Sequence, residues 1–277
     1  MFHNIFDRRR AQRFTAVLGS KRVNMNFHAQ QAYCPDEAEM WRAAVALNNI
    51  AAYLFQRHCY EQGLQTIIDA AHVMKALSAL SESCQDPAAL AAFAQDVHFR
   101  LQRANHCLSD PHSSNDFIDV VVLTEDDIES TLEISPSSDS LVLIRVEKDI
   151  GTEQNSESLS SDEVLTAAII LHNCGIAHLG VSRIRNDANQ LSRGLSLLQL
   201  ADRCLAPCCE PALQCSEDSV LILLLQIIIS QAMVQGLLES GQRDEADKFL
   251  SAFHSLRGNV QQMDEYFYGH NRAAAAA

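Results

Sequence analysis

Four cysteines within twelve residues are the strongest candidate for metal chemistry in this chain. They lie in the stretch CLAPCCEPALQC, and protein zinc sites are commonly built from cysteine thiolates at short spacings. The stretch nevertheless lacks a C-x-x-C pair, and two adjacent cysteines have difficulty pointing at one tetrahedral ion. Its two prolines indicate a loop between helices. We therefore expect free thiols and no metal or other cofactor, with a zinc site as the alternative, at Cys204, Cys208, Cys209 and Cys215.

Cys174 and His178 form a second constellation. Residues four apart share one face of a helix, so a thiolate–imidazole nucleophile is conceivable there. No carboxylate or oxyanion donor that would orient such a pair stands nearby in the sequence. The chain also has no glycine-rich phosphate loop, nucleophile elbow or paired metal-binding histidines. We predict that the protein is not an enzyme. The alternative is a metal-dependent or thiol-dependent regulator or enzyme that uses the loop from Cys204 to Cys215 or the Cys174/His178 pair.

Composition limits the classes of partner. The 277-residue chain carries a formal net charge of −14, which disfavours binding to nucleic acid. Fourteen acidic residues against two basic ones lie between positions 115 and 163, so much of this charge is local. Nine cysteines, an odd number, indicate free thiols in a reducing compartment. We expect a cytoplasmic or nucleocytoplasmic protein, although the basic stretch FDRRRAQRFTAVLGSKRV leaves organelle import open.

One apolar segment, residues 220–238, has the composition of a membrane span. Its uninterrupted apolar part is shorter than the roughly 20 residues that a spanning helix needs. A helix buried on most sides fits the segment better, so we expect no membrane span.

Helix-forming residues dominate the chain, and ten glycines and six prolines interrupt it. Two short β-branched runs, 117–123 and 141–147, predict strands or extended segments that could pair. The expected fold class is therefore mainly α, with a small two-strand or extended acidic insertion. Apolar residues at three- and four-residue spacing predict helices over 36–80 (two segments meeting near 57–61), 87–108, 162–179, 189–204, 219–238 and 244–257.

These elements divide the chain into five parts. We expect the polar tracts of the insertion to be mobile and its two β-branched runs to dock on the helices. The parts are a basic N-terminal segment (1–35), a first helical block (36–108), an acidic Ser-rich insertion (109–161), a second helical block (162–268) and a tail (269–277).

The segment ALNNIAAYLFQRHCYEQGLQTIIDAA, residues 46–71, has the pattern of a helical hairpin rather than of one long helix. Ala51 and Gly63 would let two antiparallel helices approach closely, while large apolar side chains fill the space around them. The same register fits a second segment, where Leu171, Cys174, Gly175, His178 and Gly194 take the places of Leu47, Ile50, Ala51, Leu54 and Gly63. A third unit places Met233, Val234 and Leu237 before a turn at Gly241.

This spacing of large, small and aromatic residues resembles the tetratricopeptide repeat, a 34-residue helical hairpin. No unit contains the full signature, the acidic insertion interrupts the array, and the second unit is expanded. In that unit 13 positions separate His178 from Leu191, against 6 between Leu54 and Tyr60. The segment AAIILHNCGIAHLG is also similar to helices of uncharacterised microalgal helical-repeat proteins, which implies no activity. The resemblance implies stacked antiparallel hairpins; a non-repeating helical bundle is the alternative.

Stacked hairpins of this kind leave a concave face along their first helices, and such faces hold a segment of a partner. We therefore expect a protein-binding scaffold or adaptor whose partner is another protein or a peptide segment. In the repeat register, Asn49 and Asn173 occupy the same position on that face. Repeat modules that grip a C-terminal carboxylate also use Asn there, but they add Lys or Arg at positions that hold Val45, Ile228 and Ala232 here.

Amides both donate and accept hydrogen bonds, so this face should recognise an extended or helical segment without a strong charge preference. The alternative is that Asn49 and Asn173 bond within their own hairpins. The predicted binding residues are Asn48, Asn49, Gln56, His172, Asn173, Gln231 and Gln235.

Overall fold

The structure is a computed structural model of the chain, and it describes residues 37–83, 87–108, 118–123, 141–146, 159–206 and 217–258. Every described residue belongs to one unit of the chain, Cys34–Ala277. The polar tracts of the insertion, where we expect mobility, lie outside the described residues.

The expected fold class is confirmed: antiparallel helical hairpins stack against one another, with a small two-stranded insertion. A further helix covers residues 243–258. The elements are α2 (Glu37–Gln56), α3 (Tyr60–Ser83), α4 (Pro87–Cys107), β1 (Ile118–Leu123), β2 (Leu141–Val146), α6 (Leu159–Arg185), α7 (Ala188–Leu205) and α8 (Glu217–Glu239).

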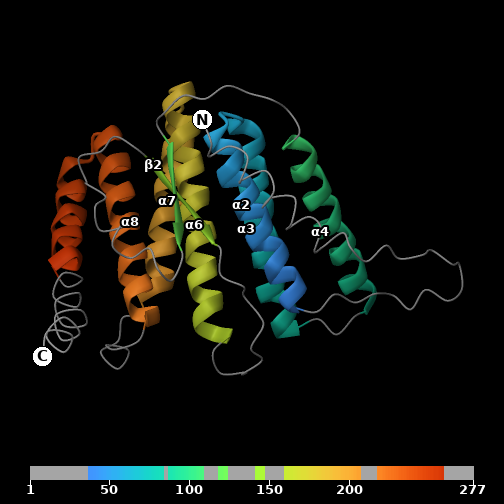
Figure 1. The fold of residues 1–277 in the computed structure, drawn as a ribbon. Helices are drawn as coiled ribbons and strands as arrows, with labels where there is room; N and C mark the ends of the chain where they lie inside the picture. The colour runs from blue at the N-terminus through green and yellow to red at the C-terminus, as the bar shows by residue number, and fades with distance from the viewer. Residues whose placement is uncertain are drawn as a thin grey trace, which may run out of the picture. The chain divides into compact units, whose positions relative to one another are not determined.

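The hairpins stack directly although the insertion separates them in the sequence (Figure 1). Helices α2 and α3 form the first hairpin, α6 and α7 the second, and α8 forms the third with the helix at 243–258. The second helix of each unit packs on the first helix of the next, α3 on α6 and α7 on α8. Helix α4 packs on α2 and α3 instead of standing between the units. The expected interruption of the array therefore applies to the sequence and not to the packing.

Small residues bring the helices of the second hairpin together, as their positions predict. A Cβ atom at Gly175 would lie 3.0 Å from the carbonyl oxygen of Gly194, and a Cβ at Gly194 would lie 2.9 Å from that of Gly175. In the first hairpin a Cβ at Gly63 would lie 2.6 Å from the ring of Phe55. Glycine is therefore needed at these crossings, because an added Cβ would clash with the opposite backbone at Gly175 and Gly194 and with the Phe55 ring at Gly63.

The three hairpins turn through the same backbone motif. In each turn one residue adopts a left-handed conformation, with φ of 59° at His58, 52° at Asn186 and 78° at Gly241. The N–H of the following residue then donates to the carbonyl five residues earlier, which is the Schellman pattern that closes a helix. These bonds run from Cys59 to Leu54 (3.0 Å), from Asp187 to Ser182 (3.2 Å) and from Gln242 to Leu237 (2.9 Å).

The predicted helix end near residue 179 is wrong, because α6 continues to Arg185. The shared turn motif places Ser182 opposite Leu54, four residues beyond the match at His178. It likewise places Leu191 opposite Gly63, three residues before the match at Gly194. The seven extra positions are thus one added turn on each helix rather than a longer loop. One turn on each side keeps the same faces in contact, since an α-helix has 3.6 residues per turn.

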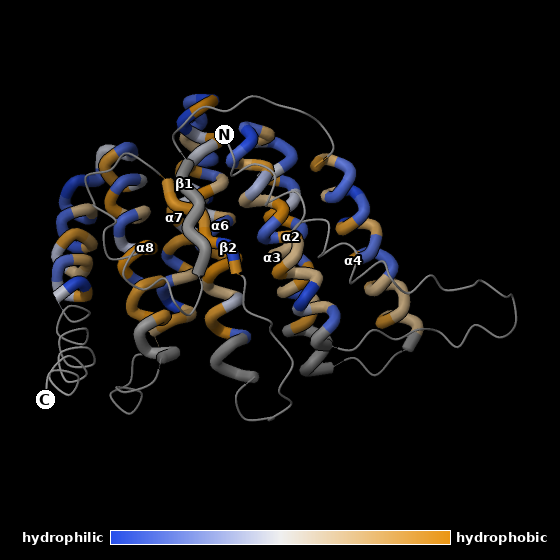
Figure 2. Tube along the Cα trace, in the orientation of Figure 1, coloured by the Kyte–Doolittle hydropathy of each residue, from blue (hydrophilic) through white to orange (hydrophobic). Residues whose placement is uncertain are grey.

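The two strands pair in parallel, with Ile118 opposite Leu141 and Leu123 opposite Val146. Strand β2 contacts α2, α6 and α8, so the predicted docking of this run on the helices is confirmed. Five of its six side chains are buried, and Arg145 is half-buried. Figure 2 shows β2 as a mostly hydrophobic segment beside the helices. Strand β2 is therefore part of the hydrophobic core.

Two helical segments, Glu163–Arg185 and Leu221–Glu239, are long and apolar enough to cross a membrane. Within the protein, 83% and 78% of their apolar windows are buried. Core helices of soluble proteins share these properties, so length and composition alone do not indicate a membrane span.

Candidate functional site

Four polar side chains from the first helices of two hairpins meet beside β2. Asn48 and Asn49 lie on α2, and His172 and Asn173 lie on α6. Asn48, His172 and Asn173 are at most 1% exposed, and Asn49 is half-buried. A buried amide or imidazole is costly unless it has hydrogen-bond partners, so these four side chains need partners within the protein.

Two asparagines hold the main chain of β2 by both of its polar groups. Asn173 accepts from the N–H of Ile144 at 2.8 Å and donates to the carbonyl of the same residue at 2.6 Å. Asn49 accepts from the N–H of Val146 at 3.0 Å and donates to its carbonyl at 2.7 Å. A side-chain amide carries the same donor and acceptor as a peptide group, so each asparagine takes the place of a neighbouring strand.

The other two side chains complete the set. His172 Nε2 lies 2.9 Å from the carbonyl of Val142, and Asn48 donates to the carbonyl of Ile144 at 3.1 Å. Asn173 also donates to the side-chain oxygen of Asn48 at 2.7 Å, which links the two hairpins. We call Asn48, Asn49, His172 and Asn173 the amide ladder.

The amide ladder contacts every second residue of β2: 142, 144 and 146. In an extended strand the N–H and C=O groups of successive residues point to opposite edges. The even-numbered residues therefore turn their polar groups to the helices, and the odd-numbered residues turn theirs to β1. Helix side chains thus seal an edge that would otherwise need another strand.

The contacts repeat from hairpin to hairpin with a fixed offset. On α2 the pair Asn48–Asn49 binds Ile144 and Val146; on α6 the pair His172–Asn173 binds Val142 and Ile144. Moving from one hairpin to the next therefore shifts the contacts by two residues along β2. Asn49 and Asn173, which share a position in the repeat register, thus make the same two bonds to β2, at Val146 and Ile144 respectively.

His172 is neutral in this environment. A carbonyl oxygen can only accept, so Nε2 must carry the hydrogen that binds Val142, which leaves Nδ1 without one. Among the described residues Nδ1 has no hydrogen-bond partner. Burial lowers the pKa of His172 to about 4, and the bond to Val142 opposes this shift in part.

The remaining predicted binding residues are placed differently. Gln56 is exposed, two helical turns beyond Asn49 on the same face of α2. Gln231 is 3% exposed and occupies on α8 the register position of Asn48 and His172. Gln235 accepts from Arg183 at 3.4 Å. The structure therefore gathers four of the seven predicted residues around β2, which the sequence did not identify as their ligand.

The alternative that Asn49 and Asn173 bond within their own hairpins is wrong. Asn49 binds a strand 97 residues away in the sequence, and Asn173 binds the same strand 29 residues away. The segment they hold belongs to the same chain and not to a partner.

The Cys174/His178 pair lacks the properties of a nucleophile. Cys174 is buried, and burial raises the pKa of its thiol to about 12, so the thiol stays protonated. His178 Nδ1 lies 2.5 Å from the side-chain oxygen of Gln190, and burial lowers its pKa. Cys204 is half-buried, whereas Cys208, Cys209 and Cys215 lie outside the described residues. Within the described part of the chain, no group of three metal-binding side chains is present.

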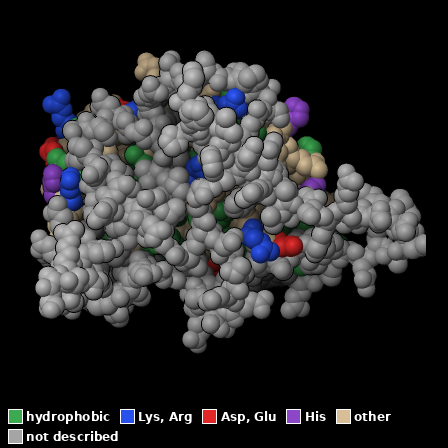
Figure 3. Space-filling model, in the orientation of Figure 1, with side chains coloured by type: hydrophobic (Ala, Val, Ile, Leu, Met, Phe, Trp, Pro, Cys, Tyr) green, Lys and Arg blue, Asp and Glu red, His purple; other side chains and the backbone are tan. Residues whose placement is uncertain are grey.

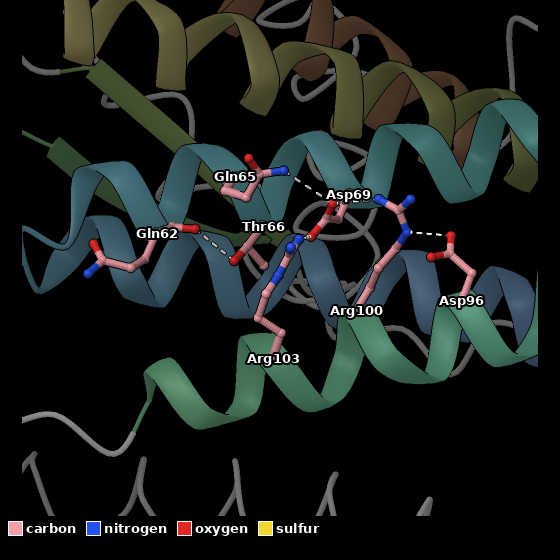
Figure 4. A network of polar contacts seen from close by, with 7 residues as sticks. All are labelled: Gln62, Gln65, Thr66, Asp69, Asp96, Arg100 and Arg103. Carbon is pink, nitrogen blue, oxygen red and sulfur yellow. Dashed lines mark hydrogen bonds and ion pairs between the residues drawn. The ribbon is translucent and has the colours of Figure 1, made fainter.

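A second polar cluster lies between α3 and α4. Asp69, 1% exposed, accepts from Arg100 at 2.6 Å, from Arg103, and from Gln65 at 3.3 Å (Figure 4). Burial alone would lower the pKa of Arg100, but its bonds with Asp96 and Asp69 outweigh this and raise it. The cluster fixes α4 to the first hairpin.

A cavity of about 480 Å³ adjoins this cluster and is lined by residues of α3, α4 and α6. Its two arginines both bind carboxylates, Arg103 that of Asp69 and Arg185 that of Glu61. The positive charge at the cavity is therefore already neutralised, and the amide ladder is the more specific of the two sites.

No protein-family model matches the chain, and neither a curated protein nor a solved structure matches it.

Proposed function

We propose that the protein is a non-catalytic, protein-binding scaffold or adaptor that holds an extended segment of a partner along the first helices of its hairpins. The main-chain contacts of the amide ladder are the observation that carries this proposal. Four side chains on two hairpins bind the polar groups of an extended segment, which is the chemistry of peptide recognition. The tetratricopeptide resemblance points to the same face, because such repeats bind their ligands along their first helices.

The ligand expected here is a protein segment of low charge. The amide ladder carries no formal charge, since His172 is neutral and the other three groups are amides. The register positions where a carboxylate-binding module would hold cations are Val45, Ile228 and Ala232, all buried. Among the described side chains visible in Figure 3, charged, histidine and hydrophobic groups are interspersed rather than gathered by kind. The net charge of −14 continues to disfavour nucleic acid.

A site-specific photo-crosslinker at Gln56 tests the proposal. Gln56 is exposed and shares the helix face of Asn49, so a bound partner should react with it in lysate of the source cell. Ser196 on α7, exposed on a second helix, is the matched control. We expect a discrete protein adduct from Gln56 and none from Ser196. Equal labelling at both positions, or none at either, would contradict a partner on the first helices.

A further inference from the structure

Strand β2 has two features that define what its binding site accepts. The side chains of Leu141, Leu143 and Ile144 are at most 1% exposed, and those of Val142 and Val146 are below 10%. Arg145 is half-buried, so this position tolerates a long polar side chain. The site therefore requires four consecutive apolar residues and a further apolar residue two positions after the fourth.

The amide ladder adds a main-chain requirement and no side-chain requirement. It needs N–H donors at the fourth and fifth of these apolar residues, the positions of Ile144 and Val146, and carbonyl acceptors there and at Val142. Proline is excluded at Ile144 and Val146 because it has no N–H. Any other extended apolar sequence satisfies the same hydrogen bonds.

Strand β2 is joined to its neighbouring elements by two long connections. Residues 124–140 join it to β1 and residues 147–158 join it to α6, seventeen and twelve residues respectively. Twelve residues can span up to roughly 40 Å when extended. The connections are thus long enough for β2 to leave its place without unfolding α6, once its pairing with β1 breaks.

We propose that β2 is the resident ligand of the amide ladder and that a partner binds by replacing it with an extended strand of the same apolar pattern. This inference rests on the proposed scaffold function and names its ligand. Replacement is favoured over opening of an empty site, because an unoccupied site would expose the buried amides and the apolar surface that β2 covers. The partner segment must therefore arrive as β2 departs.

Strand exchange in a nicked chain tests the proposal. The full chain receives one protease site within 124–140 and one within 147–158, and it is cleaved after folding, so that β2 becomes a separate peptide. A fluorescent peptide of residues 138–148 is then added, and its binding is followed by anisotropy while circular dichroism reports the helices. We expect the labelled peptide to replace the excised one.

Peptide variants identify what is recognised. Replacing the amide N–H of Ile144 by an ester oxygen should weaken binding at least about tenfold, because it deletes the donor to Asn173. The same change at Val142, whose N–H donates to none of the ladder side chains, should change binding less than about threefold. The Leu143→Asp peptide should not bind, because residue 143 is 1% exposed and the site would bury the charge. Equal loss from both ester peptides would overturn the main-chain requirement.

Two outcomes separate this inference from the scaffold function. If the nicked chain stays helical and the native peptide never exchanges, β2 is a permanent strand and the inference fails. The crosslinking at Gln56 then remains an independent test of the scaffold function. If the nicked chain loses its helices, recovery upon adding the native peptide supports the inference, and no recovery overturns it. Finally, excess native peptide should abolish the Gln56 adduct of the nicked chain; an unchanged adduct would place the partner elsewhere.

Discussion

Asn173 makes three hydrogen bonds from one buried amide, and only some of its partners have a second hydrogen bond that remains when Asn173 is removed. Truncating it leaves the N–H of Ile144 and the side-chain oxygen of Asn48 unpaired, whereas the carbonyl of Ile144 keeps its bond from Asn48. A buried unpaired polar group costs about 1–3 kcal/mol. We expect Asn173→Ala to lower the free energy of unfolding by about 2–4 kcal/mol, measured by urea denaturation with fluorescence of Trp41, the single tryptophan.

Asn49→Ala is the matched substitution at the equivalent position of the first hairpin. It leaves both main-chain groups of Val146 without their side-chain partner. Asn49 is half-buried, so water can take its place, and the expected loss is about 1 kcal/mol. A loss as large as that of Asn173→Ala would show that burial does not determine the cost.

His172 should make stability depend on pH. Its pKa is about 4 in the folded protein and 6.5 when exposed, so the unfolded chain binds the proton more tightly. Stability is therefore unaffected above pH 6.5, falls as the pH drops from 6.5 to 4, and has lost about 3 kcal/mol at the end of this window. We expect this part of the pH dependence to disappear in His172→Gln, measured as denaturation midpoints between pH 7.5 and 4.5. An unchanged profile would mean that another group carries the dependence.

The sequence predicted the equivalence of Asn49 and Asn173 but not their ligand. Equivalence follows from helical spacing, which is local. The ligand lies far along the chain, and nothing in the pattern around Asn49 indicates which segment will reach it. One signal was available: a six-residue run with no alternation of polar and apolar residues is typical of a strand buried on both faces, and such a strand needs partners at its edges.

At the scale of elements, the crossing of α6 and α7 depends on two glycines. An added methyl at Gly175 would meet the backbone oxygen of Gly194 at 3.0 Å and Cγ of Leu198 at 2.8 Å, so the helices must separate. Overpacking of this kind costs about 1–3 kcal/mol, against a gain of about 1 kcal/mol in helix propensity. We expect Gly175→Ala to be destabilising in urea. Gly258→Ala, where nothing lies within 4 Å, is the control and should not destabilise the protein.

The attachment of α4 depends on the buried carboxylate of Asp69. Asp69→Asn removes the charge that faces Arg100 and Arg103, both partly exposed and able to regain water. We therefore expect a moderate effect of about 1–2 kcal/mol, seen as faster hydrogen exchange in α4 than in α6. Asp96→Asn removes an exposed partner of Arg100 and should cost at most about 0.5 kcal/mol. Equal effects of the two substitutions would contradict docking through Asp69.

Helices were predicted well because their apolar spacing is local and strong, and capping and turn residues mark their ends. The end of α6 was missed since Val181 and Ser182 are buried like the turn before them, while the stop is made by Asn186 in a left-handed conformation. The parallel direction of β1 and β2 was beyond prediction for a different reason. The residue types of β1 and β2 fit parallel and antiparallel pairing equally well. The direction depends on the path of the segment that connects the two strands.

For the whole molecule, the insertion supplies part of the core that the helices lack. Its strand β2 buries five large apolar side chains against α2, α6 and α8. Burial of each contributes about 1.5–3 kcal/mol, and the total is comparable to the roughly 5–15 kcal/mol by which a folded domain is stable. Helices α2 and α6 contact each other as well, but the polar groups between them are satisfied through the strand.

The helical array should therefore not fold cooperatively without β2. Replacing residues 115–150 by a flexible Gly/Ser linker removes both strands and leaves Asn48, His172 and Asn173 facing an apolar gap. We expect this deletion to bind a hydrophobic dye and to lose the sharp urea transition while keeping much of its helical circular dichroism.

A shorter deletion provides the control for that experiment. The parallel register requires the chain to return over the length of one six-residue strand, about 20 Å, and the seventeen residues of 124–140 exceed this several-fold. Removing six of them leaves eleven, which still span the distance, so this variant should unfold at the same urea concentration as the intact chain. If the large deletion unfolds as cooperatively as the short one, the hairpins are self-sufficient. The amide ladder would then face solvent in a stable protein, and β2 would be a removable cover rather than a strand of the core.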